Sequence, residues 1–118
     1  MGVAGEKSRR FAVRVVRLYR FLREEKKEYV LSRQLLRSGT SIGANLAEAD
    51  YAMSKSDFLA KTYISLKEAS ETLYWLDILH RTEYLTDEQY DSLFDDAEEL
   101  RRMLSSITKS TKETLDKK

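Results

Sequence analysis

The run from Ser38 to Asn45 is the stretch of this sequence that could hold a phosphate group, since it contains two of the four glycines. A P-loop requires the spacing Gly-x-x-x-x-Gly-Lys-Ser/Thr between a strand and a helix. Here Gly39 and Gly43 are four residues apart, no lysine follows, and no strand is predicted before them. Because four residues make about one helical turn, we predict a helix in which both glycines let a neighbouring helix or subunit approach closely.

The single histidine gives little support for catalysis or metal binding. His80 follows Asp77 by three residues, whereas a di-iron bundle needs two Glu-x-x-His pairs and further inward carboxylates. No Ser-His-Asp or Cys-His arrangement can be built around one distal histidine, and the chain has no cysteine. We therefore expect a partly exposed structural histidine, and neither a metal, nor a cofactor, nor an enzyme activity.

Polar residues follow the glycine run along one arc of the same predicted helix. The arc is either a solvated face or one side of a partly buried network shared with the next predicted helix. Such a network would fix the helix register without offering a nucleophile, so an active site here is the least favoured interpretation. Its candidate members are Arg37, Ser41, Asn45, Glu48, Lys67, Glu68 and Glu71.

Charge is distributed unevenly along the chain, although the net charge is only +1. The segment from Lys7 to Lys27 has nine basic and two acidic residues, and the segment from Glu83 to Leu100 has eight acidic residues and no basic one. The arginines either solubilise the bundle and complement the acidic segment, or bind the phosphate backbone of a nucleic acid. The residues predicted for nucleic-acid binding are Arg9, Arg10, Arg14, Arg17 and Arg20.

The sequence shows neither a helix-turn-helix nor an aromatic platform of the RNA-recognition type. Nucleic-acid binding would therefore depend on shape or electrostatics.

Four amphipathic segments must position these residues. Apolar residues recur every three or four positions in each, which predicts helices joined by short connections. The helices are predicted at about residues 7-25, 28-53, 55-80 and 87-109, with Ser54–Asp57 and Thr86–Gln89 as N-terminal caps. The predicted core residues are Phe11, Val15, Leu18, Tyr19 and Leu22; Leu31, Leu35, Ser38, Ile42, Leu46 and Ala49; Phe58, Thr62, Leu66, Ala69, Leu73 and Leu76; Leu93, Ala97, Leu100, Leu104 and Ile107.

These segments predict an all-α fold, an antiparallel up-down four-helix bundle that forms one domain over residues 1-118. Residues 1–6 and the tail after about Ser110 carry little apolar surface, so we expect both to be frayed. The chain of 118 residues has no proline and no cysteine, which favours helices and a reducing compartment. It shows no membrane span and no signal-peptide core, so we expect a soluble, cytoplasmic protein.

The third predicted helix has a second apolar face opposite its core stripe. Ile64, Trp75 and Ile78 recur on one side of the helix, and Tyr74 lies beside them. Single exposed apolar residues are common, but a cluster with tryptophan and tyrosine is typical of a subunit interface. We therefore predict a homo-oligomer.

Three stretches resemble a known family. They are Leu35–Ala49 (LLRSGTSIGANLAEA), Ser54–Phe58 (SKSDF) and Leu66–Leu76 (LKEASETLYWL). The Ser-Ile-x-x-Asn-x-x-Glu core and the Lys-Glu-x-x-Glu-Thr-x-Tyr-Trp segment are similar to those of the bacterial four-helix-bundle family of 23S ribosomal RNA intervening-sequence proteins. Many relatives have glycine directly after the glutamate of the core motif, where this chain has Ala49.

The resemblance implies a homopentamer of four-helix bundles without enzyme activity. A similar protein is the accessory subunit of diversity-generating retroelements, where a basic pentamer contacts a reverse transcriptase and RNA. By analogy, the resemblance thus implies a nucleic-acid-binding or ribonucleoprotein scaffold. Its partners would be structured RNA or DNA and a nucleic-acid-processing protein. The alternative is a protein-protein assembly adaptor with no nucleic-acid role.

Overall fold

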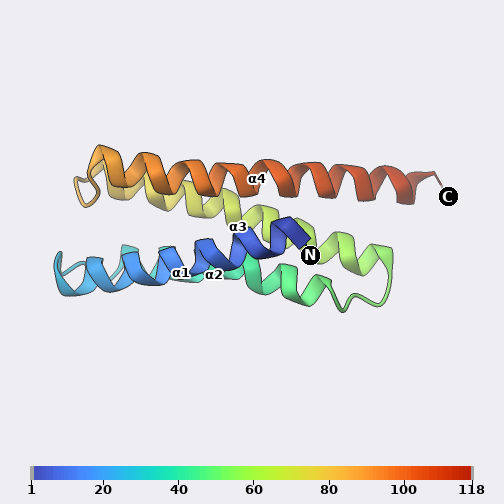
Figure 1. Cartoon of the computed structure of the whole chain (residues 1–118), viewed down its shortest axis with the longest axis horizontal. Coiled ribbons are helices and arrows are strands. Elements are labelled where there is room, and N and C mark those ends of the chain that lie inside the picture. The colour runs from blue at the N-terminus through green and yellow to red at the C-terminus, as the bar shows by residue number, and fades with distance from the viewer. Residues whose placement is uncertain (1, 118) are drawn as a thin grey trace.

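The computed structural model describes residues 2–117 and contains four helices: α1 (Gly2–Glu24), α2 (Leu31–Ala49), α3 (Lys55–Arg81) and α4 (Asp87–Asp116). Figure 1 shows them side by side in an elongated bundle of 52 × 22 × 21 Å. Each helix packs on the next one in the chain, and α1 also meets α4. Residues 2–117 contain no strand, so the predicted all-α four-helix fold is confirmed. None of these helices combines the length and hydropathy needed to cross a bilayer.

The core consists of one apolar line from each helix. Every predicted core position of α2 except Leu31 is buried, and in α1 and α4 only Tyr19 and Ile107 remain half-exposed. The prediction was less accurate for α3, where Phe58, Leu66 and Leu73 are only half-buried. The buried side of α3 includes three small polar residues, and each hydroxyl bonds a carbonyl of α3 or α2. These residues are Thr62, Ser65 and Thr72.

The helix ends differ from the predicted bounds. Helix α1 begins at Gly2 rather than at about residue 7, because Ala4 and Ser8 are buried and hold its first turns. Helix α4 continues to Asp116, and Thr108 near this end is buried. The prediction of frayed termini is therefore wrong for residues 2–6 and 111–116, while its extension to residues 1 and 118 lies outside the described chain. Burial of small side chains supplied the contacts that apolar periodicity did not indicate.

Side-chain caps set the starts of three helices. Asp57 N donates to Ser54 Oγ at 3.0 Å. Thr86 and Gln89 form a reciprocal capping box, as predicted. Helix α2 starts at Leu31, later than predicted, because the buried Glu28 carboxylate accepts the N–H groups of Val30, Leu31 and Ser32. These caps satisfy backbone donors that have no partner inside the helix.

The two glycines of α2 face α1. A Cβ on Gly39 would lie 2.7 Å from Val15 Cγ2, and a Cβ on Gly43 would lie 3.1 Å from Ser8 Oγ. Both residues are helical. The predicted close approach is thus confirmed, and the neighbour is α1 of the same chain.

Candidate nucleic-acid interface

Four of the five predicted arginines lie within an arc of about 100° on the outer side of α1. They are Arg9, Arg10, Arg17 and Arg20, and all are exposed. Arg10 pairs with Glu6 of its own helix at 3.4 Å. Within residues 2–117, the side chains of the other three make no hydrogen bond or ion pair. The arc spans about 17 Å along the helix axis and offers guanidinium groups to a ligand.

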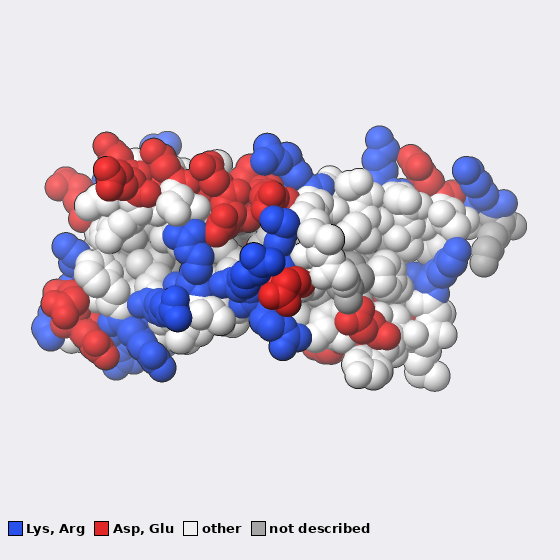
Figure 2. All heavy atoms as spheres, in the orientation of Figure 1, with Lys and Arg blue, Asp and Glu red and all other residues white. Residues whose placement is uncertain are grey.

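Arg14 lies at the edge of this arc and is held by α4. Its guanidinium is 2.5 Å from the Asp96 carboxylate and donates to the backbone and hydroxyl oxygens of Ser92. Lys7 pairs with Glu99 of α4 at 2.9 Å. Figure 2 shows the basic side chains of α1 next to the acidic ones of α4. Arg14 therefore joins two helices, whereas its arginine neighbours face solvent.

The candidate polar network on α2 and α3 divides into separate groups. Arg37 pairs with Glu71 and lies 3.6 Å from Glu68. Glu48 pairs at 3.0 Å with Lys61, a partner that the sequence pattern did not indicate. These pairs are partly exposed and tie α2 to α3.

The remaining predicted members of the network make local contacts. Ser41 Oγ donates to Arg37 O at 2.6 Å, and Asn45 Nδ2 donates to Ser41 O at 2.8 Å, both within α2. Lys67 lies over the ring of Tyr63 at 5.9 Å. The hydroxyls that do cross between α2 and α3 are in the core, where Ser65 Oγ donates to a carbonyl of α2 at 2.6 Å. No residue of this set is placed as an activated nucleophile.

The second apolar face of α3 is partly open. Ile64 and Tyr74 are 40% and 57% exposed, while Trp75 and Ile78 are half-buried. Tyr74 packs edge-on against the Trp75 ring at 5.0 Å. Trp75 Nε1 and Glu68 Oε2 are buried and have no hydrogen-bond partner within residues 2–117.

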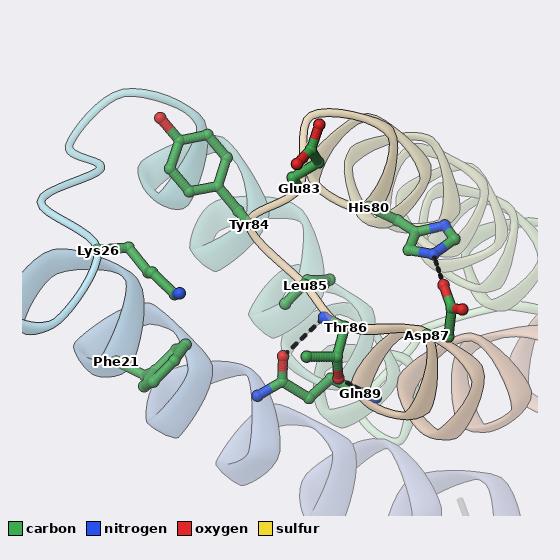
Figure 3. A pocket seen from close by; sticks show the side chains of 9 residues that line it. All are labelled: Phe21, Lys26, His80, Glu83, Tyr84, Leu85, Thr86, Asp87 and Gln89. Atoms are coloured by element: carbon green, nitrogen blue, oxygen red, sulfur yellow. Dashed lines mark hydrogen bonds and ion pairs between the residues drawn. The ribbon is translucent and has the colours of Figure 1, made fainter.

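A hollow of about 350 Å³ opens at the end of the bundle where the α1–α2 and α3–α4 connections meet. Figure 3 shows Phe21 and Lys26 on one side of it and His80 on the other, where His80 Nε2 lies 2.7 Å from Asp87 Oδ1. The imidazole also stacks on Tyr90 at 4.2 Å. His80 thus joins α3 to α4, and no serine or cysteine lines the hollow. Among residues 2–117, no three His, Cys, Asp or Glu side chains are placed to hold a metal ion.

One basic and aromatic cluster was not anticipated from the sequence. Arg23 Nη1 donates to Tyr19 Oη at 2.6 Å, and this hydrogen bond raises the pKa of Arg23. The guanidinium also lies over the rings of Tyr19 and Tyr29 at 5.4 and 5.6 Å. Tyr29 belongs to the α1–α2 connection, whose path helical periodicity does not predict. The contact between Tyr19 and Arg23 could have been predicted, because residues four apart lie next to each other on a helix.

Comparison with known proteins gives a family match and a close structural match. The model of a family described as "23S rRNA-intervening sequence protein" matches residues 3–106. A protein with unknown function from the S23 ribosomal protein family of Bacteroides thetaiotaomicron, known from a crystal structure, is 57% identical in sequence to this chain. That match covers 91% of this chain and 99% of the other, with a TM-score of 0.90. No curated protein matches the chain.

Proposed function

Because the chain belongs to the family of 23S rRNA-intervening sequence proteins, we propose that it is a non-catalytic cytoplasmic scaffold that binds nucleic acid or a ribonucleoprotein. The observation that carries this proposal is the arc of Arg9, Arg10, Arg17 and Arg20, which no neighbouring helix neutralises. A guanidinium group can donate two parallel hydrogen bonds to the oxygens of one phosphate. Helix α1 fixes the spacing of the four arginines. The ligand would be structured RNA or DNA, held through its backbone.

We further propose that the subunit is an antiparallel up-down bundle that assembles into a homo-oligomer. Arg37, early in α2, pairs with Glu71, late in α3. Glu48, late in α2, pairs with Lys61, early in α3. This order of pairing supports the antiparallel arrangement. The family resemblance implies a pentamer. Assembly would repeat the arginine arc on every subunit and so strengthen phosphate binding by multivalency.

The proposed subunit contact is the face of α3 formed by Ile64, Tyr74, Trp75 and Ile78. Ile64 and Tyr74 are exposed on the single subunit, and burying them against a second copy would remove their apolar surface from water. Light scattering coupled to size exclusion tests the contact. We expect the wild-type protein to be an oligomer and the double variant Ile64→Glu, Tyr74→Glu to be a monomer. A wild-type monomer at micromolar concentration would contradict this contact.

Titration of a structured RNA at about 50 and 200 mM salt tests nucleic-acid binding. Wild-type protein should bind at the lower salt and lose most of its affinity at the higher. The variant Arg10→Glu, Arg17→Glu, Arg20→Glu should bind weakly at both. A matched control reverses three exposed charges on α4 instead, at Arg102, Lys109 and Lys112, and should bind like the wild type.

Two outcomes would reject nucleic-acid binding through α1: no binding at low salt, or equal binding by the wild type and the α1 variant. The alternative function, a protein-protein assembly adaptor, is favoured by the exposed apolar side chains of α3. It predicts that a protein partner still co-purifies after nuclease treatment and that the α1 variant retains this partner.

A further inference from the structure

The connection between α1 and α2 holds an exposed tyrosine on a fixed backbone. Glu28 is 8% exposed, and its carboxylate accepts N–H groups from Val30, Leu31 and Ser32 at 3.3, 3.1 and 2.7 Å. Glu28 N also donates to a carbonyl of α1 at 2.9 Å. Tyr29 lies between these anchored groups and is nevertheless 45% exposed. A ring held in this way loses little conformational entropy when it binds a ligand.

Arg23 supports the ring from α1. Its guanidinium is fixed by the 2.6 Å hydrogen bond to Tyr19 and lies 5.6 Å from the centroid of the Tyr29 ring. Tyr29 thus has a cation near its ring and is still 45% exposed. A planar cation beside an exposed aromatic ring is the combination on which nucleobases stack.

Positive charge continues from the arginine arc onto this end of the bundle. Glu24 and Glu25 are the exposed carboxylates between residues 19 and 33. Five basic residues in the same range are exposed, and they are Arg20, Arg23, Lys26, Lys27 and Arg33. Since Arg20 is also the last member of the arc on α1, a nucleic-acid strand that follows the arc would reach Tyr29.

We propose that Tyr29, supported by Arg23, is a stacking site for an unpaired base of a single-stranded nucleic acid. This inference rests on the proposed function and names the part of the ligand that is recognised. Bases within a duplex stack on one another and cannot place a face on Tyr29, so a duplex meets only the arginine arc. The protein should therefore prefer nucleic acid with an unpaired segment.

Fluorescence anisotropy with two labelled RNAs tests the proposal: an unstructured uridine oligonucleotide, and a blunt duplex of the same length. Tyr29→Ala should weaken binding of the single strand about 5- to 150-fold, the usual range for one lost base stack, and leave duplex binding unchanged. Tyr29→Phe retains the ring and should bind like the wild type. Tyr51→Ala, at a tyrosine 87% exposed at the other end of the bundle, is the matched control.

The outcomes separate this inference from the proposed function. If Tyr29→Ala binds the single strand as tightly as the wild type does, or weakens both RNAs equally, the stacking site is rejected. The proposed function survives that result as long as the α1 charge reversals abolish binding. If wild-type protein binds neither RNA, both proposals fall. Circular dichroism of each variant verifies that the helices are intact.

Discussion

A methyl group at Gly39 would collide with helix α1. The Cβ of Gly39→Ala would lie 2.7 and 2.8 Å from the two Cγ atoms of Val15, which is fully buried and cannot move aside. Overpacking a core costs about 1–3 kcal/mol, whereas alanine is better than glycine in a helix by about 1 kcal/mol. We therefore predict that Gly39→Ala lowers the free energy of unfolding by about 1 kcal/mol, and by no more than about 2 kcal/mol.

Gly43→Ala supplies a comparison that removes the helix-propensity term. It has the same gain in propensity, but its Cβ would meet Ser8 Oγ at 3.1 Å, a contact that a shift of a few tenths of an ångström relieves. The difference in stability between the two variants therefore isolates the collision with Val15. We expect Gly43→Ala to be the more stable by about 1–2 kcal/mol.

Urea unfolding followed by far-ultraviolet circular dichroism measures this difference, provided that all samples have one protein concentration, since assembly contributes to apparent stability. The midpoint of Gly39→Ala should lie below that of Gly43→Ala at an unchanged slope. If Gly39→Ala equals or exceeds Gly43→Ala in stability, the close packing of α1 on α2 is not as the structure has it.

Three smaller effects are also expected, each measurable by the same unfolding experiment. Ser65→Ala removes a buried bond between α3 and α2 and should cost about 1 kcal/mol; no loss would contradict that bond. Arg101 holds the pKa of Glu98 below its ordinary value. This stabilisation is present above about pH 5 and is lost as pH falls through the folded pKa of Glu98. The difference in stability between the wild type and Glu98→Gln should therefore shrink as the pH is lowered through that range. Arg14→Ala should cost less than about 1 kcal/mol, less still at high salt, because its pair is partly exposed.

Apolar periodicity predicted α1, α2 and α4 well because the large side chains on their buried sides are apolar. It misplaced part of α3, where small hydroxyl side chains occupy the core, since a buried Ser65 whose hydrogen bond is satisfied looks polar in the sequence. The first turn of α1 was missed for a related reason. Ala4 adds little hydrophobicity, yet it is 3% exposed beneath neighbouring helices.

In the candidate site, features that depend on helical spacing could be predicted, and contacts between distant parts of the sequence could not. The arginines on the outer side of α1 could be found from helical spacing alone. The pairing of Arg14 with Asp96 could not, because it depends on the rotation of two helices that are far apart in the sequence. The contact between Arg23 and Tyr29 crosses a connection whose path is set by the buried Glu28 cap, a feature without a periodic signal.

The salt dependence of RNA affinity tests the central claim most directly. Each arginine that contacts a phosphate should contribute about 0.7–0.9 to the slope of log K against log salt concentration. The variant Arg10→Glu, Arg17→Glu, Arg20→Glu should therefore have a slope shallower by about 2–3 than the wild type, while the Arg102, Lys109 and Lys112 control keeps the wild-type slope. Equal slopes for the wild type and the α1 variant would contradict the assignment of α1 as the nucleic-acid interface.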